Sequence, residues 1–203
     1  MKKAPIEVFD SWVTLGKDEG MQKNHSEAVE NMISFATKKL EKFSFIDAGC
    51  GNGWVVRSVS KIPNCISATG VDGAFNMIDK AKKEDPQNNY ICENLLTWSP
   101  KEKVNLVHSM EVFYYLENPE ALIQHIYSNW LKENARLIIG LDFYLENPIS
   151  HSWPEECGIS IMQLLSKSTW KNFFIQAGFK GVESWSVGAK ENWSGTLVLT
   201  GTK

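Results

Sequence analysis

The sequence is poor in arginine and contains no long hydrophobic run. Only two of its 21 basic residues are arginine, Arg57 and Arg136, and its net charge is −3. Surfaces that bind nucleic acid are usually basic and rich in arginine, so nucleic acid is not an expected partner. No segment approaches the length that spans a bilayer, and the lysines of the opening "MKKAPIEVFD" precede no apolar stretch. We therefore expect no membrane association and no secretory signal, and a cytoplasmic protein.

Cysteine is also sparse, and its spacing excludes two classes of site. Cys50, Cys65, Cys92 and Cys157 form no Cys-x-x-Cys pair, which argues against both a zinc site and a disulfide framework. No internal repeat and no linker rich in glycine, serine or proline divides the 203 residues, a length that suits one large domain. We expect a single domain over 1–203 with reduced thiols and no metal.

What the sequence does contain is an alternation of short apolar runs with amphipathic stretches. A first long helix is predicted from Asn24, a suitable N-cap, because apolar residues then recur at helical spacing. Short apolar runs, which predict strands, occur at 43–49, 66–72, 89–92, 104–109 and 135–143. Helical patterns between these runs occur at 53–62, 74–84 and 118–132. Strands that alternate with helices predict βαβ units and a parallel sheet covered on both faces.

The end of the chain departs from this alternation. A helical stretch, "STWKNFFIQAG", ends at Gly178, a good C-cap residue, and the strand-like runs "GVESWSV" and "WSGTLVLTGTK" follow it. The polar turn "GAKEN" between them has the length of a hairpin turn, so we expect an antiparallel pair at the edge of an otherwise parallel sheet. The expected fold is α/β and doubly wound.

Three glycines follow the first predicted strand in "FIDAGCGNG", residues 45–53. In a doubly wound sheet, ligands bind at the carboxyl ends of the strands. Glycines at that point allow positive φ and let a ligand approach the backbone, and a helix that starts near Gly53 points N–H groups at the site. Asp47 ends the first strand and Asp72 ends the second. A carboxylate at the end of the second strand is where nucleoside-binding sheets hold a ribose diol.

The spacing of the glycines separates two classes of nucleotide ligand. A dinucleotide-binding loop reads Gly-x-Gly-x-x-Gly, and the third glycine would fall on Trp54 or Val56 in the two possible alignments. An NAD-dependent oxidoreductase is therefore disfavoured. The loop reads Gly-x-Gly-x-Gly after an acid, a pattern that suits a ligand carrying an ammonium group.

The segments "IDAGCGNG", "GVDGAFNMIDKAK" and "WLKENARLIIG", with "AGF" before the last strand pair, resemble the class I S-adenosylmethionine-dependent methyltransferases. The resemblance covers residues 43–203, and residues 1–42 would form a helical lid region ahead of this Rossmann-like core. It implies seven strands in the order 3-2-1-4-5-7-6 with the last antiparallel. It implies S-adenosylmethionine as cofactor and S-adenosylhomocysteine as product. The turn "KENA" departs from the Pro-Gly-Gly that the family often has there.

The resemblance also assigns cofactor-binding residues. Asp47, with the backbone at Gly49 and Gly51, would hold the methionine end, and Asp72 would hold the ribose hydroxyls. Glu93 or Asn94 would meet the adenine amino group, and the sequence leaves open which of the two does so. The other implied cofactor residues are Gly53, Gly73, Met77, Leu95, Ser109 and Met110.

The acceptor side has weaker signals, taken from residues near the strand ends. Transfer to an oxygen, nitrogen or carbon nucleophile that carries a proton can need a general base. A base or polarising group is expected among His25, Tyr115 and His151. The long segment 141–165 is too aromatic to be disordered and is expected to line the substrate site. The expected substrate residues are Tyr114, Asp142, Tyr144 and Trp153.

These observations predict a methyltransferase that acts on a small molecule, as a monomer or homodimer. Carboxylates beside aromatic rings would suit an amine or another cationic substrate. The alternative from a different class is a sensor that binds S-adenosylmethionine without transferring its methyl group.

Overall fold

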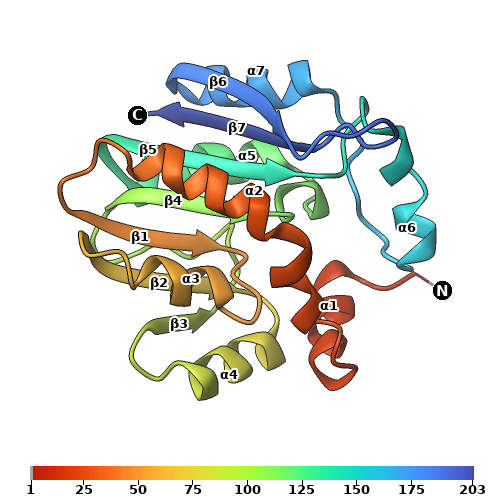
Figure 1. Ribbon diagram of the computed structural model, residues 1–203, viewed down its shortest axis with the longest axis horizontal. Coiled ribbons are helices and arrows are strands. Elements are labelled where there is room, and N and C mark those ends of the chain that lie inside the picture. The colour runs from red at the N-terminus through yellow and green to blue at the C-terminus, as the bar shows by residue number, and fades with distance from the viewer. Residues whose placement is uncertain (1) are drawn as a thin grey trace.

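A computed structural model describes residues 2–203 and contains a seven-stranded sheet in the order β3-β2-β1-β4-β5-β7-β6 (Figure 1). The strands are β1 (Phe43–Ala48), β2 (Cys65–Asp72), β3 (Asn89–Cys92), β4 (Val104–Met110), β5 (Leu131–Leu141), β6 (Lys180–Val187) and β7 (Thr196–Thr202). β7 runs antiparallel to both β5 and β6, and the other neighbouring strands are parallel. The predicted α/β fold, strand order and terminal antiparallel pair are confirmed.

Helices cover both faces of this sheet (Figure 1). They are α1 (Pro5–Thr14), α2 (Glu19–Thr37), α3 (Trp54–Val59), α4 (Phe75–Glu84), α5 (Pro119–His125), α6 (Trp153–Glu156) and α7 (Lys167–Ala177). α2, α3 and α4 contribute to one apolar cluster, which contains Met32, Val56 and Ile78. α5 and α7 contribute to the other, which contains Leu122 and Trp170. No helix within residues 2–203 is both long enough and apolar enough to cross a bilayer.

The central strands are buried on both faces, as a parallel sheet between two helical layers requires. Every residue of β1 is buried. Along it, Phe45 packs in the cluster on the α2 side, whereas Ile46 packs in the cluster on the α5 side. This alternation aims Asp47 toward the α2 side at the carboxyl end of the strand, where the glycine loop begins.

The chain begins with two helices where one was expected. α2 starts at Glu19 and not after Asn24, and α1 precedes it. The predicted N-cap at Asn24 is therefore wrong. The boundary lies at Asp18, whose side chain is fully buried and bonded to other elements, so tertiary contacts set the start of the helix. Gly20 in the first turn weakens the helical pattern there, because glycine is a poor helix former.

Three further boundaries differ from the sequence prediction. The helix predicted over 118–132 begins as expected, with Asn118 as N-cap and Pro119 in the first turn, but α5 ends at His125 and continues as the π-helical turn Ile126–Trp130. β5 then begins at Leu131, earlier than expected, with a register shift against β4. The connection between β6 and β7 spans residues 188–195 and is longer than the turn predicted from "GAKEN".

Candidate functional site

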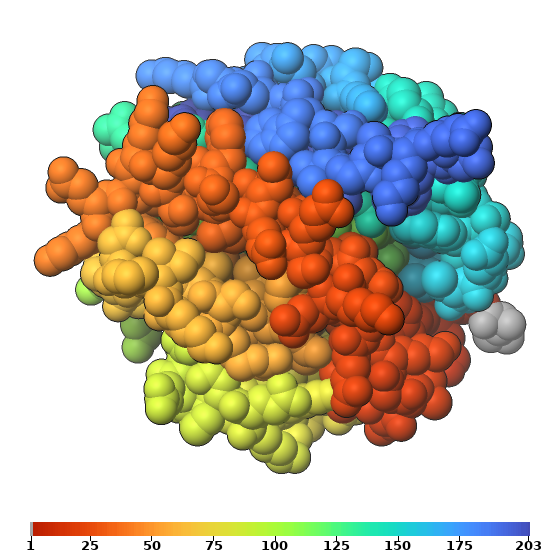
Figure 2. Space-filling view, in the orientation of Figure 1, coloured from red at the N-terminus to blue at the C-terminus, as the bar shows by residue number. Residues whose placement is uncertain are grey.

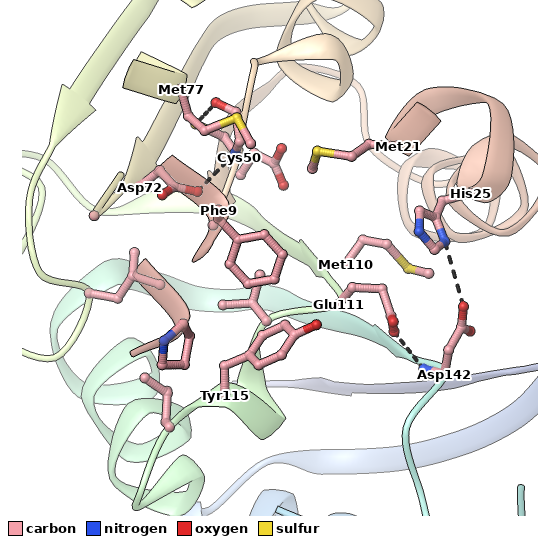
Figure 3. Close-up of a pocket in the computed structure, with 18 of the residues that line it drawn as sticks. Phe9, Met21, His25, Cys50, Asp72, Met77, Met110, Glu111, Tyr115 and Asp142 are labelled. Atoms are coloured by element: carbon pink, nitrogen blue, oxygen red, sulfur yellow. Dashed lines mark hydrogen bonds and ion pairs between the residues drawn. The ribbon is translucent and has the colours of Figure 1, made fainter. Parts of the chain in front are cut away.

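A cavity of about 1090 Å³ lies at the carboxyl ends of β1, β2, β4 and β5 (Figure 3). The glycine loop and Asp72 border one half of it. His25 on α2, Glu111 after β4 and Asp142 after β5 border the other half, and Figure 3 shows these three side chains pointing toward one another. The cavity therefore occupies the edge of the sheet where doubly wound folds bind ligands.

The N-terminal segment closes the cavity from outside. Lys3 forms two backbone hydrogen bonds with the 141–165 segment, donating to the carbonyl of Gly158 (2.9 Å) and accepting from the N–H of Ser160 (2.9 Å). On the other side, Asp10 Oδ1 accepts the backbone N–H of Asn76 at the start of α4 (2.7 Å). In Figure 2 this red segment bridges the yellow-green α4 and the cyan 141–165 segment. The cavity is thus roofed by parts of the chain that are far apart in sequence.

A buried carboxylate joins this roof to the glycine loop. Asp18 Oδ2 accepts from Asn52 Nδ2 (3.0 Å) and from Lys80 Nζ (2.6 Å), and its side chain has no exposed surface. The hydrogen bond to Asp18 raises the pKa of Lys80. A β-carbon at Gly51 would lie 2.7 Å from Met21 Cε. A glycine at that position therefore lets α2 lie directly against the loop.

Asp72 fixes the shape of the glycine loop from the end of β2. Its Oδ2 accepts the backbone N–H of Gly51 (2.9 Å), and its Oδ1 accepts that of Ala74 (2.8 Å). Gly49 and Gly51 have φ of 77° and 51°, values that glycine adopts without strain. Burial raises the pKa of the Asp72 carboxyl. Asp72 therefore serves the loop as well as any ligand beside it.

Asp47 is paired with a histidine inside the sheet. His108 on β4 is its register partner, and His108 Nδ1 lies 2.7 Å from Asp47 Oδ1. Asp47 is 2% exposed and borders the cavity, whereas His108 is fully buried behind it.

A second acidic cluster lies across the cavity. Glu111 adopts a φ of 61°, an uncommon and strained value for a residue with a β-carbon. Its Oε1 accepts the backbone N–H of Asp142 (2.5 Å), and its Oε2 accepts from the hydroxyl of Tyr114. Burial and the nearby charge of Asp142 raise the pKa of Glu111 well above its usual range. These two hydrogen bonds hold the carboxyl in a fixed orientation at the cavity.

His25 and Asp142 complete this cluster. His25 Nδ1 lies 3.6 Å from Asp142 Oδ2. Burial lowers the pKa of the His25 imidazole to about 4, and burial raises the pKa of the Asp142 carboxyl to about 6. At neutral pH the pair therefore consists of a neutral imidazole and a carboxylate, both able to accept a proton.

Most of the predicted cofactor residues come together at the cavity. The lining residues among them are Asp47, Gly49, Gly51, Asp72, Gly73, Met77, Glu93, Asn94, Leu95 and Met110. Gly53 and Ser109 do not line it. The Ser109 hydroxyl is buried and donates to the carbonyl of Ala48 (2.6 Å), while a β-carbon at Gly53 would lie 2.5 Å from the Tyr90 ring. The Ser109 hydroxyl thus joins β4 to the end of β1, and Gly53 leaves room for the Tyr90 ring.

The predicted acceptor-side residues divide into two groups. His25, Tyr115, Asp142 and Trp153 line the cavity. Tyr114, Tyr144 and His151 do not line it, and their polar atoms form hydrogen bonds with other residues. The Tyr114 hydroxyl donates to Glu111, the Tyr144 hydroxyl donates to the carbonyls of Ser194 and Gly195, and His151 Nε2 lies 3.1 Å from the carbonyl oxygen of Leu145.

Four residues at or behind the cavity had no recognised signal in the sequence. Glu111 directly follows the predicted residues Ser109 and Met110, so its position at a strand end was the signal available. His108 lies within a predicted strand, and its contact with Asp47 depends on the pairing of β1 with β4. Phe9 and Trp12 belong to α1, which was not predicted. Among residues 2–203, no group of three or more His, Cys, Asp or Glu side chains could hold a metal ion.

The buried His25 predicts a pH-dependent difference in stability. Because its pKa in the folded protein lies below the usual 6.5, the folded state binds fewer protons, and the free energy of unfolding falls as pH drops through this range. Between about pH 7.5 and about pH 5 this loss amounts to about 2 kcal/mol. His25→Gln is expected to remove this pH-dependent loss. In denaturant unfolding, the free energy of unfolding of wild type should therefore fall relative to that of the variant by this amount as the pH is lowered. An equal difference at both pH values would contradict a neutral, buried His25.

Comparison with known proteins agrees with this geometry. Residues 21–184 match the family described as methyltransferase domain. Trans-aconitate 2-methyltransferase of Rhizobium rhizogenes is 30% identical over 111 residues, which cover 55% of this chain and 43% of that protein. The chain spans less than half the length of the curated relatives that it matches.

Solved structures share the whole fold. A Haloferax volcanii protein solved in complex with a methyltransferase activator superposes with a TM-score of 0.84 at 23% identity, covering 96% of each chain. The N-methyltransferase NodS of Bradyrhizobium japonicum, solved with S-adenosylhomocysteine, has a TM-score of 0.69 at 16% identity and covers 88% of this chain and 86% of its own. With the family match over residues 21–184, the chain belongs to the class I S-adenosylmethionine-dependent methyltransferases, and S-adenosylmethionine is its cofactor.

Proposed function

We propose that the chain transfers the methyl group of S-adenosylmethionine to a nitrogen atom of a small amine. The observation that carries this proposal is the second acidic cluster, in which Glu111 and Asp142 face the cavity opposite the glycine loop. Neither arginine of the chain lines the cavity. Arg57 pairs with Glu84, and Arg136 lies over the Phe35 ring. With Asp142 ionised at neutral pH and no arginine at its border, the cavity favours a cationic acceptor over a carboxylate.

We assign the half of the cavity beside the glycine loop to the cofactor. The residues there fit it, because the loop glycines keep side chains away from the backbone, Asp47 offers a carboxyl to an ammonium group, and Asp72 offers one to ribose hydroxyls. When bound, S-adenosylmethionine supplies a methyl group that its sulfonium has already activated. The other cofactor residues that we propose are Gly73, Met77, Glu93, Asn94, Leu95 and Met110.

The other half of the cavity combines the acidic cluster with aromatic rings. Aromatic faces and carboxylates together attract ammonium groups through cation–π and ionic contacts. Lys190 is the one lysine that borders the cavity within residues 2–203. The aromatic side chains that border the cavity are those of Phe9, Trp12, Trp54, Tyr115, Trp153 and Trp193. This composition suits an amine that also carries an apolar or aromatic group.

The same cluster offers a path for the proton of the acceptor. An ammonium nitrogen has no lone pair with which to attack, so it must lose a proton before or during transfer. Asp142, with a pKa of about 6, is ionised at neutral pH yet basic enough to accept that proton. His25, 3.6 Å from Asp142 and with a pKa of about 4, is the weaker base of the two, so Asp142 is the proton acceptor that we propose. The remaining task of the chain is to align the reactants, which can contribute about 7–11 kcal/mol.

Two panels of acceptors test this proposal. The purified chain would be incubated with S-adenosylmethionine and either small amines or small carboxylic acids, and methylated products would be detected by mass spectrometry. We expect products from amines, and Asp72→Ala, which should bind the cofactor poorly, gives the background. Products from acids or phenols alone would refute the amine assignment. Cofactor binding with no product from any acceptor would favour the sensor alternative.

A further inference from the structure

The pair formed by Asp47 and His108 suggests how the chain prepares its cofactor site. The two residues are register partners on adjacent parallel strands, so their side chains leave the same face of the sheet. His108 Nδ1 lies 2.7 Å from Asp47 Oδ1. No other described side chain pairs with the Asp47 carboxylate in a hydrogen bond or salt bridge. His108 is therefore the side chain that orients this carboxylate.

The surroundings of His108 determine which of its ring nitrogens forms a hydrogen bond. Its Nε2 is buried and has no hydrogen-bond partner within residues 2–203. The side chain is fully buried on the face that holds Phe45, Leu106 and Ile138, and the Phe45 ring centroid lies 6.2 Å from that of His108. Nδ1 is therefore the ring nitrogen that has a partner, and its N–H donates to Asp47 Oδ1.

This arrangement leaves the negative charge on the cavity side. Asp47 borders the cavity and His108 does not. The hydrogen bond that His108 donates to Oδ1 from within the sheet orients the Asp47 carboxylate. The unshared oxygen is then available to a cation in the cavity.

We propose that His108 is a positioning residue that holds Asp47 for the ammonium group of the cofactor's methionine end. The proposal rests on the assignment of that end to Asp47. His108 acts only through Asp47 and touches no ligand. Its effect is therefore confined to ligands that carry the amino-acid portion.

Two ligands and two variants separate this role from a structural one. S-adenosylhomocysteine carries the amino-acid portion, whereas 5′-methylthioadenosine lacks it. His108→Leu should raise the Kd for S-adenosylhomocysteine by about tenfold and change that for 5′-methylthioadenosine less than about twofold, as measured by calorimetry. His108→Asn should retain near wild-type affinity for both, because an asparagine amide nitrogen can occupy the position of Nδ1 and donate to Asp47.

Other results would overturn the inference. Equal weakening of both ligands by His108→Leu would mean a structural role, as would an asparagine variant that behaves like the leucine one. If His108→Leu does not fold, His108→Gln makes the same comparison with His108→Asn, because its amide reaches past the Nδ1 position. Asp47→Asn tests the underlying assignment. If Asp47→Asn binds S-adenosylhomocysteine normally, the assignment of the methionine end to Asp47 is wrong. If Asp47→Asn selectively loses affinity for S-adenosylhomocysteine and His108→Leu does not, only the role proposed for His108 is wrong.

Discussion

Asp142→Asn is expected to lower kcat/KM for an amine acceptor about 100-fold while changing the affinity for S-adenosylhomocysteine little. The substitution preserves size and removes the charge and the basicity of a side chain that is 4% exposed. Its backbone N–H can still donate to Glu111 Oε1. The loss should therefore reflect missing proton acceptance and cation binding, and not a collapsed site.

The pH profile makes this prediction specific. In wild type, kcat/KM should rise with pH through about 6, the pKa of Asp142, because the ionised carboxylate is the active form. In Asp142→Asn this limb should be absent. Asp79→Asn is the matched control, since Asp79 is also an aspartate but forms an exposed pair with Lys83 on α4. A variant that keeps the limb, or keeps wild-type kcat/KM, would show that another group accepts the proton.

The sequence predicts best those site residues that lie close together along the chain. Asp47, Gly49 and Gly51 follow one another in a single strand-to-helix turn, and Asp72 ends the next strand. Parallel strands bring their carboxyl ends to the same edge, so each pattern could be located without knowing how distant segments pack. The strand order could be expected for the same reason, once these turns pointed to the family.

The acceptor half depends on contacts that no local pattern encodes. Asp142 was expected at the site because it lies in the long segment 141–165, but its partner Glu111 is defined by a backbone hydrogen bond across 31 residues and by a strained φ. α1 reaches the cavity because Lys3, just before it, and Asp10, within it, form hydrogen bonds with segments far along the chain. His151 has the right chemistry, yet its ring is bonded to Leu145 and lies away from the cavity.

The two halves of the cavity differ in the elements that build them, and this difference has a functional consequence. Asp47 and Asp72 lie at the carboxyl ends of β1 and β2, so the sheet places their carboxylates. The acceptor half is built from α1, α2 and the 141–165 segment, and Asp18 fastens α2 to the glycine loop through Asn52. Movement of this roof would change the acceptor site first. Cofactor affinity and acceptor affinity should thus respond to different substitutions.

Asp72→Ala provides the sharpest test of the cofactor half. We expect it to weaken binding of S-adenosylmethionine by about 2–4 kcal/mol, because it removes hydrogen bonds to a charged group from both ligand and loop. The Gly51 and Ala74 N–H groups lose their acceptor at the same time. In calorimetry, Kd should rise roughly 30- to 1000-fold.

The choice of ligand distinguishes this effect from that of His108. Both S-adenosylhomocysteine and 5′-methylthioadenosine contain the ribose, so Asp72→Ala should weaken both, whereas His108→Leu should weaken only the first. We expect Asp72→Ala to fold. Burial raises the pKa of the Asp72 carboxyl, so removing this carboxyl relieves the cost of a buried charge and offsets the loss of its two hydrogen bonds. Asp79→Ala, on the exposed side of α4, should change neither affinity. If Asp72→Ala folds and binds both ligands normally, the ribose lies elsewhere, and the glycine loop of this chain holds its shape without the carboxylate.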